Sequence, residues 1–133
     1  MSERKVIRVQ DVMAKDFAMV DGLITIREAI EIYKNEKVSA LLVNKRHDDD
    51  EYGILLLSDI AKKVLAQDRA PERMNVYEVM TKPVIGVDPQ MDVRYCARLF
   101  DNFGLAMAPV LHNGQVMGVV GYNQIVLDGL LTE

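Results

Sequence analysis

The 133-residue sequence contains a single cysteine, Cys96, and no tryptophan. One cysteine cannot form a disulfide within the chain, which fits a reducing compartment, so we expect a cytoplasmic protein. No stretch approaches the roughly 18 consecutive apolar residues that a membrane-spanning helix needs. The charged start, Met-Ser-Glu-Arg-Lys, is not followed by the apolar segment of a signal peptide. We therefore expect no membrane partner.

Clustered basic residues are also lacking, since 16 Lys and Arg are outnumbered by 20 Asp and Glu and the formal net charge is −4. Nucleic-acid binding needs concentrated Lys and Arg to neutralise phosphates, so we expect no nucleic-acid partner. Half of the residues are hydrophobic, which is enough for one core or for two small lobes that share one.

Recognisable catalytic and metal-binding patterns are missing as well. No nucleophile and base stand at a familiar spacing, and His112 lies beside an Asn-Gly turn without a Cys or Ser partner nearby. The acidic run from His47 to Glu51 lacks the turn glycine and spaced ligands of a calcium loop, so we interpret it as a solvated hairpin tip. The sequence therefore predicts no catalytic residue, no metal site and no enzyme activity.

An internal repeat is the main positive feature. The motif Val-Gln-Asp-Val-Met ending at Met13 returns as Val-Tyr-Glu-Val-Met ending at Met80, 67 positions later. The same offset relates two apolar stripes with helical spacing. The first stripe is Ile26, Ala29, Ile30 and Tyr33, and the second is Val93, Cys96, Ala97 and Phe100. We expect two similar helices, the first capped by Thr25 with Glu28 and the second by Asp92.

Strand patterns follow the same repeat. The predicted strands are 17–20, 38–44 and 53–57 in the first half, and 84–87, 105–111 and the segment from 118 in the second. Pro109 indicates an edge strand or a special strand start, and Asn113-Gly114 predicts a tight hairpin that shortens the offset to 65. Ser58 and Asn123 are predicted to cap the two closing helices, with Ile125, Val126 and Leu130 facing inward on the second.

The sequence thus predicts an α/β (α+β) fold made of two β-α-β-β-α repeats. We expect the first repeat at 1–66, a polar linker at 67–74 and the second repeat at 75–133. Each half can hide its sheet face only against the other half or against another chain, which favours a pseudo-twofold pair of lobes.

This arrangement resembles a tandem pair of CBS domains, the repeats named after cystathionine β-synthase that form a Bateman module. The similarity runs from about Arg8 to Leu131. It depends on Asp11-Val-Met13 and Glu78-Val-Met-Thr81, on Val38–Val43 and Ala106–Val110, and on the two glycine-led strands that enter helices. The resemblance implies a regulatory module that binds AMP, ADP, ATP or S-adenosylmethionine in clefts between the repeats.

The family's ribose site has the pattern Gly-x-x-Thr/Ser-x-x-Asp, which this chain matches in part. The first repeat keeps Asp59 but has Leu56 at the hydroxyl position, and the second has Gly121 and Gln124. The resemblance therefore implies at most one site of the usual kind. The ligand-binding residues that it implies are Asp59, Ser58, Lys37, Lys82, Val84, Met107 and Ala108. The residues alone leave an alternative open for each: Asp59 and Ser58 as residues that stabilise the helix start, and Lys37 as a solvated lysine at a helix end.

Two functions remain open at this stage. The first is a stand-alone regulatory module that binds an adenosine-containing ligand, with no other cofactor, and signals to an unidentified effector protein. The alternative is a dimerisation or scaffold module whose nucleotide sites have decayed. In both cases the resemblance implies a homodimer that forms through the helices.

Overall fold

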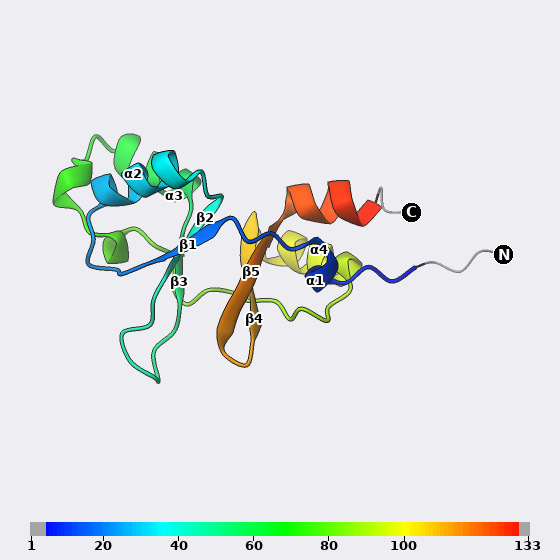
Figure 1. Cartoon of the computed structure of the whole chain (residues 1–133). Coiled ribbons are helices and arrows are strands. Elements are labelled where there is room, and N and C mark those ends of the chain that lie inside the picture. The colour runs from blue at the N-terminus through cyan, green and yellow to red at the C-terminus, as the bar shows by residue number, and fades with distance from the viewer. Residues whose placement is uncertain (1–4, 131–133) are drawn as a thin grey trace. The chain divides into compact units, whose positions relative to one another are not determined.

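The computed structural model describes residues 5–130, which form two compact units (Figure 1). The continuous unit consists of residues 16–84, and the split unit joins residues 5–15 to residues 85–130. The sequence repeats predicted at 1–66 and 75–133 therefore differ from the compact units, because each unit combines the body of one repeat with the opening segment of the other. Among the described residues, none of the helices has the length and apolar character needed to cross a membrane.

The continuous unit has a three-stranded sheet in the order β1-β2-β3. Strand β1 is parallel to β2, and β3 is antiparallel to β2. Along the chain the elements are β1 (Phe17–Val20), α2 (Ile26–Glu36), β2 (Ala40–Val43), β3 (Gly53–Leu55), α3 (Leu57–Ile60) and the helical turns η1 (Ala61–Leu65), η2 (Pro71–Arg73) and η3 (Val76–Glu78). The predicted capping box is confirmed, since the Glu28 N–H donates to Thr25 Oγ1 at 3.1 Å and the Thr25 N–H donates to Glu28 Oε1 at 3.0 Å.

The split unit has a hairpin of two antiparallel strands. Its elements are α1 (Val9–Val12), α4 (Val93–Phe103), β4 (Met107–His112), β5 (Gln115–Gly121) and η4 (Gln124–Asp128). The predicted Asn-Gly turn is confirmed, because Asn113 and Gly114 both have positive φ, 52° and 76°. Asp92 caps α4 as predicted by accepting a hydrogen bond from the Arg94 N–H at 2.9 Å.

The strand predicted at 84–87 is shorter than its counterpart β1. It is reduced to one parallel bridge between Val87 and Val110, in which the Leu111 N–H donates to the Val87 carbonyl at 2.9 Å. The next donor along β4 would be residue 109, two positions earlier, and Pro109 has no N–H. The proline therefore explains why this pairing ends while the equivalent pairing of β1 with β2 continues.

Matching hydrogen bonds join each opening segment to the body of the other repeat. In the split unit the Val9 N–H donates to the Met91 carbonyl at 2.8 Å, and in the continuous unit the Val76 N–H donates to the Ile24 carbonyl at 2.9 Å. These donors and these acceptors are each 67 positions apart. The duplication predicted from the sequence is therefore present in the contacts within the two units.

Two glycines make room for the opening segments. A Cβ atom at Gly53 would lie 2.6 Å from Met80 Sδ, and one at Gly118 would lie 3.1 Å from Met13 Sδ and 2.8 Å from the Ala14 carbonyl. At Gly118 the contact with the Ala14 backbone leaves no room for a side chain, whereas at Gly53 a side chain would require the end of Met80 to move. The methionine of each Val-Met motif thus packs against the first glycine of a glycine-led strand, Met80 against Gly53 and Met13 against Gly118.

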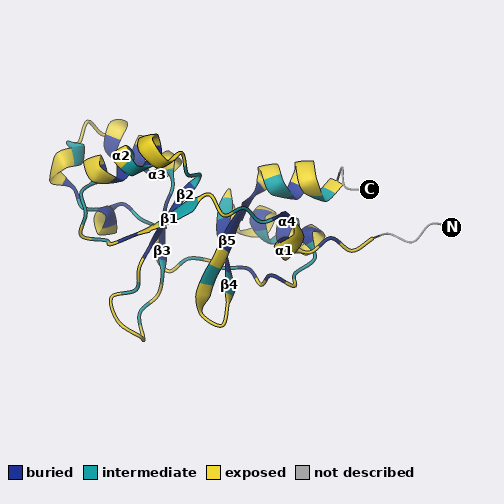
Figure 2. Cartoon of the chain, viewed as in Figure 1, coloured by how far each residue is buried: buried dark blue, intermediate teal, exposed yellow. Residues whose placement is uncertain are grey.

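Each unit has its own apolar core, with the buried residues concentrated on the strands and the inner sides of the helices (Figure 2). Tyr33 and Phe100, the equivalent large residues of the two helical stripes, are 7% and 0% exposed, and Cys96 is fully buried as predicted. Burial raises the pKa of the Cys96 thiol to about 11, so it stays protonated at neutral pH. The inward orientation predicted for Val126 and Leu130 is wrong, because they are 44% and 75% exposed.

Candidate functional site

Asp59 lies in the first turn of α3, immediately after the end of β3. Its Oδ2 accepts a hydrogen bond from the Leu56 N–H at 2.9 Å, which fixes the start of the helix. The helix begins at Leu57, so Leu56 holds the cap position and the predicted cap role of Ser58 is wrong. The cause is that Asp59 already reaches back to the backbone, and Ser58 is left exposed within the first turn.

The second repeat starts its closing helix with the same contact and a different residue. Gln124 Oε1 accepts a hydrogen bond from the Gly121 N–H at 2.8 Å. Asn123 has helical dihedral angles, φ −57° and ψ −49°, so the predicted cap at Asn123 is wrong as well. Asp59 and Gln124 therefore perform the same structural task, but only Asp59 brings a carboxylate.

Tyr33 braces the strand that leads to Asp59. Its hydroxyl donates to the Leu55 carbonyl and accepts from the Leu41 N–H at 3.2 Å, which ties α2 to the paired ends of β2 and β3. Burial, with a further contribution from the negative charge of Asp59, raises the pKa of the Tyr33 phenol. The phenol therefore remains neutral and keeps its proton for the Leu55 carbonyl. Phe100 occupies this position in the second repeat and has no hydroxyl.

Met107 occupies the space that a side chain at position 121 would need. A Cβ atom at Gly121 would lie 3.1 Å from Met107 Cε and 3.2 Å from the Ala106 carbonyl. Neighbouring Ala108 is fully buried in β4, opposite Val120. In the second repeat, the position of the family's hydroxyl is thus closed by packing as well as by the absence of a side chain.

The remaining predicted residues of the continuous unit lie at two edges of its sheet. Leu55 pairs with Leu41, so Asp59 follows β3 at the edge where β2 begins, and Lys37 precedes β2 at this same edge. The segment of Lys82 and Val84 runs to the opposite edge, where β3 begins. Met107 and Ala108 belong to the split unit. The seven residues that the resemblance implies are therefore not brought together within one unit, and their role in binding a ligand remains a prediction.

The interpretation of the acidic run from His47 to Glu51 as a solvated hairpin tip is wrong for Asp50. Its side chain is only 8% exposed, and Oδ1 lies 2.8 Å from Lys82 Nζ. Arg46 adds a second ion pair at 3.2 Å between its Nε and Asp50 Oδ2. The hydrogen bond from Lys82, followed by that from the Arg46 backbone, lowers the pKa of Asp50. The hairpin loop is therefore anchored by a carboxylate that the sequence pattern did not distinguish from its neighbours.

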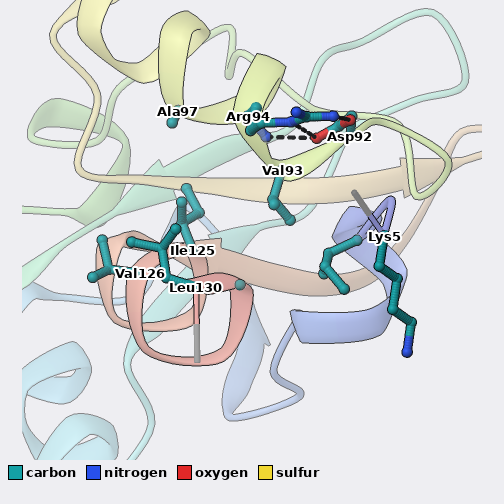
Figure 3. A pocket seen from close by; sticks show the side chains of 10 residues that line it. Lys5, Asp92, Val93, Arg94, Ala97, Ile125, Val126 and Leu130 are labelled. Atoms are coloured by element: carbon teal, nitrogen blue, oxygen red, sulfur yellow. Dashed lines mark hydrogen bonds and ion pairs between the residues drawn. The ribbon is translucent and has the colours of Figure 1, made fainter. Parts of the chain in front are cut away.

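Two pockets were not predicted from the sequence, and neither is lined by Asp59. The apolar pocket, of about 490 Å³, lies in the split unit between the start of α4 and the C-terminal helical segment (Figure 3). Ile125, Val126 and Leu130 line one side of it, while Lys5 and the Asp92–Arg94 ion pair stand at its polar rim. The Arg94 hydrogen bonds lower the pKa of Asp92 and keep it ionised.

The basic pocket, of about 520 Å³, lies in the continuous unit. Its lining consists of residues 21–23, residues 43–46, Tyr77, Met80 and Lys82. Because β1 and β2 are parallel, residues 21–23, which follow β1, and residues 43–46, which begin with the last residue of β2, meet at one edge of the sheet. This edge is the one opposite Asp59.

Comparison with known proteins gives one family. The model of the CBS domain matches the chain twice, at residues 9–66 and 76–127. A solved structure of a hexameric CBS-CP12 protein from bloom-forming cyanobacteria is 34% identical, with a TM-score of 0.89, over 94% of this chain and 73% of that protein.

A second solved structure is the CBS domain pair of protein MJ0100 in complex with 5′-methylthioadenosine and S-adenosyl-L-methionine. It is 27% identical, with a TM-score of 0.79, over 94% of this chain and 98% of that chain. A homoserine O-acetyltransferase of Methanosalsum zhilinae is 31% identical over 90% of this chain but only 23% of its own length. The chain spans less than half the length of the first curated relatives that it matches.

Proposed function

Because the chain belongs to the CBS domain family, we propose that it is a regulatory module that binds one adenosine-containing ligand through Asp59. The observation that carries this proposal is the position of the Asp59 carboxylate at the start of α3. Its backbone contact uses Oδ2 and leaves Oδ1 for a ligand. A carboxylate can accept hydrogen bonds from both hydroxyls of a ribose, and bonds to charged groups contribute about 1.5–3 kcal/mol each.

The class of ligand is supported by the MJ0100 domain pair, whose solved structure contains 5′-methylthioadenosine and S-adenosyl-L-methionine. Both molecules contain an adenosine, whose ribose diol suits an acidic partner. We therefore propose AMP, ADP, ATP or S-adenosylmethionine as ligand. Lys37 stands at the same edge of the sheet as Asp59 and is proposed to contact the phosphate or carboxylate end.

Binding is proposed to be asymmetric between the two repeats. Gln124 offers neutral hydrogen bonds only, and its amide oxygen is already engaged by the Gly121 N–H. Met107 fills the space beside Gly121. Losing the charge-assisted bonds costs about 1–2 kcal/mol, which corresponds to roughly tenfold or more in affinity. We expect one ligand per chain.

A thermal-shift panel with AMP, ADP, ATP and S-adenosylmethionine tests this proposal. A ligand at 100 times its Kd adds about 2.7 kcal/mol to the free energy of unfolding, which raises Tm by several degrees. Asp59→Gln should abolish the shift and still fold, because Gln124 makes the same backbone contact in the second repeat. Asp11→Gln is the matched control, since Asp11 accepts from the Arg8 N–H at 2.9 Å in the same way, and its ligand response should be unchanged.

The proposed role is regulatory rather than enzymatic, with the ligand signal passed to a separate effector protein. The Asp59 carboxylate can accept hydrogen bonds from a ribose, and Tyr33 holds the strand that precedes it. This arrangement suits ligand binding rather than catalysis by a nucleophile and a base. If no adenosine-containing compound raises Tm at millimolar concentration, the scaffold alternative replaces this proposal.

We further propose that the module forms a homodimer through the helices of the split unit. Tyr95 and Phe103 of α4 are each 59% exposed, and Leu127 and Leu130 of the C-terminal segment are 57% and 75% exposed. These apolar side chains, together with the apolar pocket, suit a second copy of the chain. The hexameric assembly of the cyanobacterial relative also supports self-association.

Light scattering should give a mass of twice the 15.0 kDa monomer at micromolar concentration. Leu127→Glu should shift the mass toward the monomer, because it places a charge in the proposed interface. Glu72→Lys, a surface change in the continuous unit, should leave the mass unchanged. A wild-type mass near 15.0 kDa would count against the dimer.

A further inference from the structure

The basic pocket is built by backbone that the fold holds in place. The Asp21 carbonyl accepts a hydrogen bond from the Ile24 N–H at 3.3 Å, and the Gly22 carbonyl accepts one from the Tyr77 N–H at 3.0 Å. The Asn44 N–H donates to the Val20 carbonyl at 2.9 Å. The two loops that form the pocket are therefore bonded to the sheet and to the segment of Tyr77.

Positive charge predominates among the side chains of this pocket. Lys45, Arg46 and Lys82 line it together with one carboxylate, Asp21. Asp50 pairs with Lys82 at 2.8 Å and with Arg46 at 3.2 Å, so the three cations face two carboxylates. One positive charge remains in excess, which suits an anion of low charge.

Lys45 is the cation best suited to meet such an anion. Its Nζ lies 5.0 Å from the centroid of the Tyr52 ring, and among the described residues Lys45 is in none of the ion pairs. Lys82 is already engaged by both oxygens of Asp50, at 2.8 and 2.9 Å. The acidic residues Asp48 and Asp49 of the same loop are exposed and would repel a highly charged polyphosphate.

The rest of the lining is apolar and aromatic. Leu23 and Tyr77 are 73% and 52% exposed, while Val43 and Met80 are more deeply buried. Gly22 lies beside these residues, since a Cβ there would lie 3.4 Å from both the Tyr77 Cβ and Val43 Cγ1, an ordinary contact distance. Beside its cations, the pocket thus offers a surface against which an apolar or aromatic group can pack.

We propose that the basic pocket binds a small monophosphorylated compound with an apolar or aromatic body, independently of the Asp59 site. The phosphate contacts Lys45 and Arg46, and the body packs against Tyr77 and Leu23. Because the pocket and Asp59 lie at opposite edges of the same sheet, a ligand in the pocket leaves the Asp59 carboxylate untouched. The two sites can therefore be tested separately.

Phenyl phosphate is the probe that combines both features. We would titrate it into the full chain and follow the backbone amides by two-dimensional NMR, with inorganic phosphate and benzyl alcohol as half-probes. Saturable shifts should centre on Gly22, Asn44 and Tyr77, and each half-probe should bind more weakly. Higher salt should weaken binding of phenyl phosphate, because the cations involved are partly exposed.

Three variants separate the contributions. Lys45→Met keeps most of the apolar stem and should weaken phenyl phosphate about tenfold, the usual effect of losing one charge-assisted contact. Tyr77→Leu should reduce the preference for phenyl phosphate over inorganic phosphate. Lys62→Met, an exposed change outside the pocket, and Asp59→Gln should both bind like the wild type.

The proposal is overturned if the shifts centre on Leu56–Asp59, or if no saturable shifts appear at millimolar probe. It is also overturned if Lys45→Met, with a dispersed spectrum that shows an intact fold, binds as tightly as the wild type. Failure of the adenosine-containing ligands to bind would not affect this result, since the proposal does not depend on the Asp59 site.

Discussion

Replacing Tyr33 with phenylalanine should destabilise the protein by about 1–3 kcal/mol. The ring and its packing are kept, and only the hydroxyl that connects the Leu55 carbonyl with the Leu41 N–H is lost. Tyr33 is 7% exposed, so water cannot easily replace the missing partner, and each buried group left without one costs about 1–3 kcal/mol. Because Leu41 and Leu55 are paired residues of adjacent strands, we expect the total cost to stay near the value for one such group.

The assay is urea unfolding followed by circular dichroism, at one protein concentration so that any dimerisation is constant. In a thermal unfolding experiment on a chain of this size, the same loss of stability should lower Tm by roughly 3–10 °C. Tyr95→Phe is the matched control, because the same hydroxyl is removed from a side chain that is 59% exposed, and its effect should stay within about 0.5 kcal/mol. If Tyr33→Phe costs no more than this control, the bracing role of the phenol is refuted.

Two further outcomes are expected. Gly118→Ala should destabilise the protein more than Gly53→Ala in the same urea assay. At Gly118 the new Cβ would lie 2.8 Å from the backbone carbonyl of Ala14, whereas at Gly53 its shortest contact, 2.6 Å, would be with the movable side-chain end of Met80 and the next, 3.3 Å, with Val43 Cβ. Equal costs would contradict that explanation. The lowered pKa of Asp50 means that its contribution to stability is complete above its unfolded value of about 3.9 and is lost as the pH falls through its folded value. Asp50→Asn should therefore show a smaller loss of stability between pH 5 and pH 2 than the wild type, and an identical acid profile would contradict the ion pair.

The fold was largely predictable because the same pattern of apolar residues and turns occurs twice in the sequence, so each half supports the interpretation of the other. The stripes that end at Tyr33 and Phe100 have helical spacing, and Asn113-Gly114 allows few alternatives to a tight turn. The exchange of opening segments was not predictable, because Val9 and Val76 have the same sequence context in both repeats. Local patterns establish that a segment must pack, but not which copy of the repeat receives it.

The candidate site was predictable only in part. The position of Asp59 followed from the glycine-led strand, yet the helix starts at Leu57 because the carboxylate itself holds the Leu56 N–H. Asp50 could not be distinguished from the neighbouring acids, since Lys82, its partner in the partly buried ion pair, is 32 residues away in sequence. A contact of this kind depends on tertiary packing, which the spacing of charges does not encode. The basic pocket was missed for the same reason.

Isothermal titration calorimetry of the wild type, with each adenosine-containing compound in turn, tests the central proposal most directly. At least one of AMP, ADP, ATP and S-adenosylmethionine should bind with a stoichiometry of one per chain, and Asp59→Gln should remove this binding while Gln124→Ala retains it. The absence of binding by all four compounds at millimolar concentration, or binding that persists in Asp59→Gln, would contradict a regulatory site built on Asp59.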